Sequence, residues 1–272
     1  MLLYLRIVLF DPAVKLFKLF PIFFRFAYSK YILKYYWQGI YKNFSEVPPN
    51  GKGYNSDDWA ITTYISTKKS LLSYNSDSRK VDLENLLKPV KEVLQSQKKI
   101  KIYDFGGGMG ISYIYLKNNL PTDVDLEYHI TENKAVCDYG KKIFGNDSKI
   151  IFNPEIPAST KDFDIVYTRD AMQYVDDYKA VLNILCSMDA KYFLATKLPA
   201  DAISSFVSAE VNVGQSSIPY RFFNENEFID QVKLKGYSIV YGESEPFYYD
   251  ISNFPAEYRI KKYAMLLFKK AS

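Results

Sequence analysis

Four glycines within five positions follow an apolar segment and an acid near the middle of the chain. The segment reads Ile102-Tyr-Asp-Phe-Gly106-Gly-Gly-Met-Gly110, with Asp104 as the acid. Glycine lets the backbone turn sharply and lie against a ligand, because a Cβ atom would occupy the ligand's volume. The pattern therefore predicts a nucleotide-like ligand at the carboxyl end of a strand.

The spacing of the glycines separates the classes of nucleotide-binding loop. A dinucleotide fingerprint, G-x-G-x-x-G, counted from Gly106 needs a third glycine where Ile111 stands. A Walker-type loop needs G-K-S/T, which does not follow. The pattern that is present is D-x-G-x-G-x-G, from Asp104 to Gly110. Oxidoreduction with NAD is therefore the weakest of the alternatives.

A second acid stands where a ribose could be bound. Glu132 ends the next predicted strand, in His129-Ile-Thr-Glu132, 22 residues beyond Gly110. A carboxylate at this place can accept hydrogen bonds from both ribose hydroxyls. The separation suits a loop, a helix and a strand, so both acids are expected at one edge of a sheet.

The loop and the second acid together resemble motif I and the following strand of class I S-adenosylmethionine-dependent methyltransferases. The resemblance implies that the loop faces the ribose and methionine portions of S-adenosylmethionine, and that Asp104 organises the loop and the amino group. It also implies that the segment after the third strand approaches the adenine. The cofactor contacts that it implies are Asp104, Gly106, Gly107, Gly108, Gly110, Glu132 and Asn153.

Shorter pieces resemble one group of bacterial methyltransferases associated with surface polysaccharide (capsule or lipopolysaccharide) biosynthesis. The resemblance implies O-methylation of a sugar or sugar-linked group, with a carbohydrate or sugar-phosphate acceptor. Methylation of a small molecule or lipid at a membrane, and a non-catalytic binding domain, are the alternatives. The pieces are Trp37-x-Gly39, Gly53-Tyr54, Gln173-Tyr-Val175 and Pro219–Phe223.

Methyl transfer needs positioning of donor and acceptor and, for a hydroxyl acceptor, a base. Asp170 in the loop after the fourth strand is the preferred base, with Tyr174 and His129 as further candidates. A helix-capping acid, a packed tyrosine and a structural histidine are the competing interpretations. Arginine can hold an anionic acceptor, and transfer to phosphate, carboxylate or amine needs no strong base. The substrate-binding candidates are Arg169, Tyr220 and Arg221.

Strand and helix patterns alternate from Ile100 onward, which predicts a doubly wound, seven-stranded, mostly parallel α/β sheet. A helix is also expected from Ser56, and another over 81–97 with a kink at Pro89. The expected strands are 100–105, 125–130, 149–152, 163–168, 191–196, 237–242 and 260–269, and the expected helices between them are 111–119, 133–144, 175–188 and 225–235.

The chain divides by composition into an N-terminal helical, aromatic extension with a connector (1–55) and a cofactor-binding domain (56–272). Residues 1–36 are basic and aromatic, and charges interrupt every apolar run before it reaches the roughly 20 residues that span a bilayer. The segment is expected either to pack on the domain or to lie at a membrane surface. A cytoplasmic protein, at the inner face of the membrane in the second case, is predicted.

The remaining composition argues against several classes of partner. The net charge of +4 comes from dispersed residues, so no nucleic acid partner is expected. Two distant cysteines and one histidine form no set with metal-ligand spacing, so neither a metal site nor a disulfide framework is predicted.

Overall fold

The computed structural model describes most of the chain beyond its first 34 residues. The predicted N-terminal helical pair, within residues 1–36, thus lies almost entirely outside the described residues. Among the described residues no helix is both long and apolar enough to cross a membrane. The described ranges are 35–48, 50–51, 53–72, 80–157, 162–213 and 216–271.

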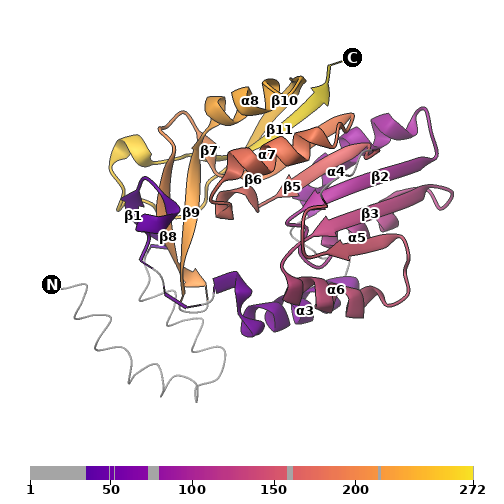
Figure 1. Ribbon diagram of the computed structural model, residues 1–272, viewed down its shortest axis with the longest axis horizontal. Coiled ribbons are helices and arrows are strands. Elements are labelled where there is room, and N and C mark those ends of the chain that lie inside the picture. The colour runs from indigo at the N-terminus through magenta and orange to yellow at the C-terminus, as the bar shows by residue number, and fades with distance from the viewer. Residues whose placement is uncertain are drawn as a thin grey trace.

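The main sheet has seven strands and confirms the predicted doubly wound architecture (Figure 1). The five strands from β2 to β6 are parallel, and β11 pairs antiparallel with both β6 and β10. The predicted late hairpin is therefore present. In spatial order the strands are β10 (Tyr237–Pro246), β11 (Lys262–Lys270), β6 (Tyr192–Leu198), β5 (Ile165–Arg169), β2 (Lys99–Phe105), β3 (Asp125–Thr131) and β4 (Ile150–Asn153).

Helices lie on both sides of this sheet, and its strands β5 and β6 are buried almost throughout. Helices α7 (Tyr178–Ser187) and α8 (Glu225–Lys233) pack on one face through a core that includes Leu182 and Phe228. The other face carries α4 (Lys80–Leu94), α5 (Ile111–Asn119) and α6 (Lys134–Phe144). The middle of the sheet is thereby buried between two helical layers, whereas β2 and β3 keep partly exposed charged side chains.

Side-chain caps fix where several helices begin. Ser56 Oγ accepts a hydrogen bond from the Trp59 amide at 3.2 Å and so caps α3 (Asp57–Leu72), as predicted. Asn133 caps α6 in the same way, with 3.0 Å between its Oδ1 and the amide of Val136. Pro89 lies inside α4.

A second, four-stranded sheet lies beside the main sheet and was not predicted from the sequence (Figure 1). Three of its strands come from the segment between β6 and α8, and the fourth comes from residues 37–41, within the extension expected to be helical. Trp37 packs on Tyr220 and Phe222, with ring centroids 5.0 and 5.6 Å apart. The strands are β1 (Trp37–Tyr41), β8 (Phe206–Val213), β9 (Ser216–Asn224) and β7 (Ala200–Asp201).

Four short 3-10 helices lie in the connections that the structure describes, and two of them contribute to the site. They are η1 (Phe44–Glu46), η2 (Gly53–Asn55), η4 (Met172–Tyr174) and η5 (Ala256–Tyr258).

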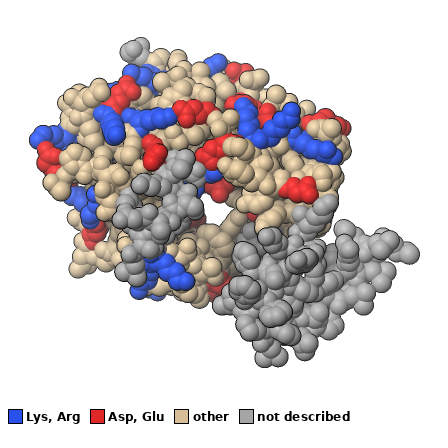
Figure 2. Space-filling model, turned by 180° about the vertical axis from the view of Figure 1, so that it is seen from behind, with Lys and Arg blue, Asp and Glu red and all other residues tan. Residues whose placement is uncertain are grey.

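On the face shown in Figure 2, acidic and basic side chains are interspersed, so this face carries no stripe of one charge.

Candidate cofactor and acceptor site

A cavity of about 830 Å³ opens at the carboxyl ends of β2, β3 and β5. Open α/β sheets bind their ligands at this edge. The glycine loop and the ends of the three strands form one wall. Helix α3, η2 and the first part of β9 form the other, so both sheets contribute to the cavity.

The loop glycines meet different surroundings. A Cβ atom on Gly106 would lie 2.2 Å from the Cβ of Ala171, and one on Gly107 would lie 2.5 Å from Oδ2 of Asp104. Gly108 has a φ of +56°, and a Cβ there would meet nothing within 4 Å. The protein itself therefore requires glycine at 106 and 107, whereas the space above Gly108 is left open for a ligand.

Asp104 ends up deeply buried beneath the loop, with 1% of its surface exposed. The Tyr128 hydroxyl donates to its Oδ2 at 2.6 Å. Within the described part of the chain, nothing hydrogen-bonds its Oδ1. Burial raises the pKa of Asp104 to about 7, although the Tyr128 hydrogen bond and the charge of Arg169 oppose this. A cationic group of a ligand would supply the hydrogen bond that Asp104 Oδ1 lacks within the described residues.

Glu132 lies across the loop from Asp104, at the end of β3, and also lines the cavity. Its Oε1 accepts hydrogen bonds from the amide and side-chain nitrogens of Asn133, at 2.8 and 3.2 Å. Burial raises the pKa of Glu132, and backbone hydrogen bonds from Asn133 and Gly108 oppose the shift. The carboxylate is thus held in one orientation at the cavity edge.

The end of β5 brings Arg169 and Asp170 to the same cavity. The positive charge of Arg169 acts to lower the pKa of Asp104, against the larger effect of burial. Asp170 is exposed, has a φ of +54°, and accepts a hydrogen bond from Gln173 Nε2 at 2.5 Å. A positive φ is unusual for a residue other than glycine and marks a constrained turn at this position.

Tyr174 also lines the cavity, and its hydroxyl donates to Oε2 of Glu210 at 3.0 Å. The hydroxyl of Tyr54 lies 2.9 Å from that of Tyr174 and 3.4 Å from Glu210 Oε2. The amide of Gly53 donates to Ser216 Oγ at 2.9 Å and ties η2 to β9. The side chains of Tyr54, Tyr174 and Glu210 thus meet, although their elements η2, η4 and β8 are far apart in the sequence.

Sequence reasoning missed Tyr54 and Glu210 as site residues. For Tyr54 the Gly53-Tyr54 pair was a signal, because it belongs to the resemblance noted above. For Glu210 the signal is the alternation of apolar and polar residues over 207–213, which is typical of a strand. This pattern predicts a strand, but it does not predict that Glu210 lies next to Tyr54.

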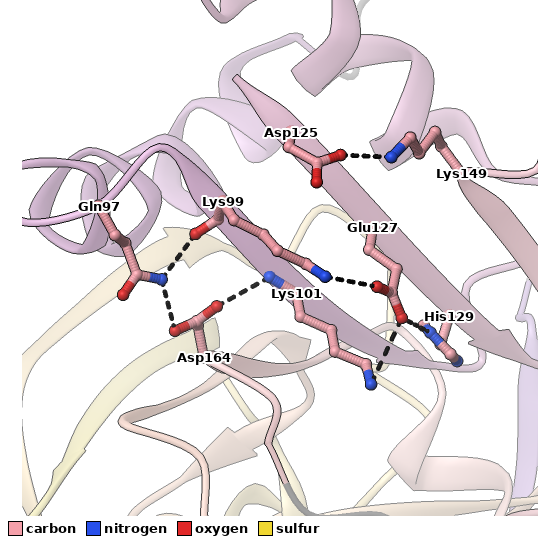
Figure 3. Close-up of polar contacts among 8 residues, drawn as sticks. All are labelled: Gln97, Lys99, Lys101, Asp125, Glu127, His129, Lys149 and Asp164. Carbon is pink, nitrogen blue, oxygen red and sulfur yellow. Dashed lines mark hydrogen bonds and ion pairs between the residues drawn. The ribbon is translucent and has the colours of Figure 1, made fainter. Parts of the chain in front are cut away.

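The structure does not bring His129 to the cavity. Its Nε2 lies 2.7 Å from Oε1 of Glu127, two residues earlier on the same face of β3 (Figure 3). Lys101 pairs with the same carboxylate at 3.3 Å. The imidazole also packs edge-on against Phe163, with ring centroids 5.1 Å apart. This arrangement is that of a structural histidine in a polar cluster on the surface of the sheet.

Tyr220 and Arg221 do not line the cavity either, although Ser217–Pro219 just before them do. Alternation along β9 sends the two side chains to opposite faces. Tyr220 is buried, with its ring 5.3 Å from that of Tyr174. Arg221 donates to the Asp176 carbonyl at 3.0 Å, and Phe44 and Tyr178 flank its guanidinium.

Asn153 ends β4, next to the cavity edge. Its carbonyl accepts a hydrogen bond from the Glu132 amide at 3.2 Å. The side chains that line the cavity from this segment are those of Pro154 and Ile156. Asn153 therefore supports Glu132 through its backbone.

The described residues contain no group of three His, Cys, Asp or Glu side chains that could hold a metal ion. Cys137 and Cys186 are both buried and carry free thiols.

Known structures share this fold at low sequence identity. An S-adenosylmethionine-dependent methyltransferase from Mesorhizobium loti is 12% identical and aligns over 72% of this chain and 99% of its own, with a TM-score of 0.51. A protein from Galdieria sulphuraria, assigned as a sarcosine dimethylglycine methyltransferase, is 13% identical over 72% and 88% of the two chains, with a TM-score of 0.51.

A third match is the complex of the Haloferax volcanii Trm112 methyltransferase activator with a protein assigned as a methyltransferase. The matched chain is 14% identical, and the alignment covers 79% of this chain and 96% of the other, with a TM-score of 0.51. No protein-family model and no curated protein matches the sequence. The strand order and these structures together show that the chain has the fold of class I S-adenosylmethionine-dependent methyltransferases.

Proposed function

We propose that this protein is a methyltransferase that uses S-adenosylmethionine to methylate a hydroxyl of a sugar or sugar-linked acceptor. The observation that carries the proposal is the glycine loop over the cavity. The backbone of Gly108 hydrogen-bonds Glu132, Gly107 packs so closely on the Asp104 carboxylate that a Cβ atom would not fit, and the space above Gly108 is open. The shared fold supports the same interpretation.

The loop and the two acids would hold the cofactor. The free Oδ1 of Asp104 suits an ammonium group, because a buried carboxylate oxygen without a donor is costly. The oriented carboxylate of Glu132 suits a pair of ribose hydroxyls. When bound, S-adenosylmethionine supplies an electrophilic methyl group on a sulfonium. The residues that would form this half of the site are Asp104, Gly106, Gly107, Gly108, Gly110 and Glu132.

The acceptor would lie against the wall formed by Tyr54, Trp59, Asp170 and Tyr174, all of which line the cavity. Aromatic rings with polar handles suit the faces and hydroxyls of a sugar. Arg169, on the same edge, could pair with a sugar phosphate. In this arrangement the acceptor hydroxyl meets several polar groups close to the cofactor loop.

The biological setting that we propose rests on the sequence resemblance alone. It is surface polysaccharide biosynthesis, of capsule or lipopolysaccharide, in a bacterial cytoplasm or at the inner face of its membrane, with residues 1–36 as the segment that would contact that membrane. Methylation of a lipid or of another small molecule would use the same cofactor half of the site with a different acceptor.

The test is transfer of radioactive methyl from methyl-tritiated S-adenosylmethionine into an extract of source cells that lack the gene. The proposal expects tritium in a polar carbohydrate fraction with the wild-type protein, and little with Glu132→Ala. Label in the organic-solvent fraction would instead indicate a lipid acceptor. Binding of S-adenosylhomocysteine without transfer of label would indicate a non-catalytic domain and would contradict the proposal.

A further inference from the structure

A buried carboxylate stands behind the acceptor wall and is connected to it by two tyrosines. Glu210, on β8, is 7% exposed and does not itself line the cavity. Tyr174 Oη donates to its Oε2 at 3.0 Å, and Tyr54 Oη lies 2.9 Å from Tyr174 Oη. Because both tyrosines line the cavity, their hydroxyls form a continuous path from the cavity to Glu210.

Within the part of the chain that the structure describes, this carboxylate has no positive partner. Among the described residues its hydrogen bonds come from Tyr54 and Tyr174, and no Lys, Arg or His forms an ion pair with it. Burial of a carboxylate without a cation is costly, and such sites are retained more often for function than for stability. A purely structural role would be served better by an amide of the same shape.

The groups that face Glu210 keep it ready to take up a proton. Burial, and then the negative charge of Asp170, raise its pKa to about 7, while the hydrogen bonds from Tyr174 and Tyr54 oppose the shift. Burial and the charge of Glu210 in turn raise the pKa of both tyrosines, so near neutral pH these are neutral phenols that can donate. The other titratable groups around it are Tyr220, Tyr249 and Tyr263.

We propose that Glu210 is the final proton acceptor of the methyl transfer, and that Tyr54 and Tyr174 carry the proton to it from the acceptor hydroxyl. The inference rests on the proposed function. The acceptor oxygen forms its bond to the methyl carbon as the bond from that carbon to sulfur breaks. The acceptor proton passes to Tyr54, the Tyr54 proton to Tyr174, and the Tyr174 proton to Glu210. Both tyrosines end neutral, and the carboxylate ends as a carboxylic acid.

Asp170 is the competing proton acceptor, because it faces the cavity directly. It is exposed, however, and its Oδ1 already accepts from Gln173. Glu210 is shielded from water and accepts hydrogen bonds from the hydroxyls of two tyrosines that line the cavity. The geometry therefore favours Glu210 as the acceptor and leaves Asp170 to orient the substrate.

The first test follows the ionisation of Glu210 without any acceptor. An infrared pH titration of the protonated carboxyl band, assigned by its loss in Glu210→Gln, should give a midpoint near pH 7. Tyr174→Phe removes a hydrogen bond to the ionised form and should raise the midpoint by about one pH unit. Tyr237→Phe is the matched control, because that buried hydroxyl donates to the Ala190 carbonyl at 2.8 Å, outside the cavity.

The second test follows transfer in the tritium assay at saturating S-adenosylmethionine. The wild-type rate should rise with pH through the midpoint of Glu210, and Glu210→Gln should lower it at least about 100-fold and remove the pH step. Its affinity for S-adenosylhomocysteine, measured by calorimetry, should stay that of the wild type. Glu225→Gln is the matched control, since that carboxylate pairs with Lys262 and lies outside the cavity.

Three results would overturn the proton path: an unmoved midpoint in Tyr174→Phe, a wild-type rate and pH step in Glu210→Gln, or loss of the pH step in Asp170→Asn instead. If the wild-type protein transfers label and Glu210→Gln matches it, only the role of Glu210 fails. If the wild-type protein binds S-adenosylhomocysteine but transfers no label, the proposed function fails and the proton path fails with it.

Discussion

Single residues of the loop differ in what a side chain at each position would meet. At Gly106 and Gly107 a Cβ atom would collide with Ala171 and Asp104, so substitution there damages the fold and says nothing about a ligand. At Gly108 the same atom would project into open space. Gly108 is therefore the position where binding and stability can be separated.

We expect Gly108→Ala to weaken binding of S-adenosylhomocysteine at least about tenfold, because its Cβ enters the ligand's volume. The positive φ of Gly108 should cost about 1 kcal/mol of stability. Gly236→Ala is the matched control, since Gly236 has a φ of +81° and its Cβ would come no closer than 3.7 Å to Lys270. Calorimetry and thermal unfolding of both variants test this; equal affinity of the two variants would remove Gly108 from the ligand site.

Glu132 should contribute directly to binding of the ribose. Loss of its charge-assisted hydrogen bonds predicts about 1.5–3 kcal/mol weaker binding of S-adenosylhomocysteine by Glu132→Ala. A 2′-deoxy analogue should lose less affinity on this variant than on the wild-type protein, because the partner of the missing hydroxyl is already gone. Equal losses on both proteins, measured by calorimetry, would argue against direct contact.

Among the elements, those of the main sheet were predicted from the sequence and those of the second sheet were not. Parallel strands alternating with helices leave a local pattern, and α5 begins and ends at the predicted residues, 111 and 119. In the second sheet, β1 pairs Trp37 with Glu210, which lies far along the chain. Residues 207–213 of β8 alternate apolar and polar, which is typical of a strand, but this local pattern does not reveal that the strand pairs with β1 and β9.

The site residues differ in the same way: some could be predicted from local sequence pattern, and others depend on contacts between distant segments. Asp104 stands near the end of one predicted strand and Glu132 just after the next, so their place at the sheet edge could be predicted from local pattern alone. The orientation of Tyr220 and Arg221 depends on the register of β9, which the sequence does not reveal. The role of Glu210 could not be predicted, because it depends on the fold of β8 and on proximity to Tyr54, a contact between distant segments.

The lowered pKa of Glu127, on β3, predicts how the stability of the folded protein changes in acid. Burial acts to raise the pKa of Glu127, but the hydrogen bond to His129 and the charge of Lys101 outweigh it and hold the pKa at about 2 (Figure 3). A pKa lowered by folding stabilises the folded state above the ordinary glutamate value and ceases to do so as pH falls towards 2. The contribution should be roughly 1–2 kcal/mol, since water screens these partly exposed charges.

Glu127→Gln should therefore lose stability at pH 6 and show a shallower decline between about pH 5 and pH 2 than the wild-type protein. Glu84→Gln, at an exposed position of α4, is the control and should follow the wild-type decline. Urea unfolding at several pH values measures both. A parallel decline in Glu127→Gln and the wild type would show that this pair of side chains does not carry the effect.

In the whole molecule, the two sheets supply different halves of the cavity. The main sheet contributes the glycine loop and the acids at its carboxyl edge, and the second sheet contributes Ser217–Pro219 and, behind the tyrosines, Glu210. The second sheet also has its own aromatic core around Trp37 and Phe222. We therefore propose that the main sheet binds the cofactor and that the second sheet adapts the site to its acceptor.

The most direct measurement for this account is calorimetric titration of the wild-type protein with S-adenosylhomocysteine and, separately, with NAD. We expect saturable binding of S-adenosylhomocysteine at one site per chain, with no heat from NAD, because the D-x-G-x-G-x-G loop lacks the glycine that a pyrophosphate site needs at position 111. Binding of NAD in place of S-adenosylhomocysteine, or binding of neither ligand, would show that the loop is not a site for S-adenosylmethionine.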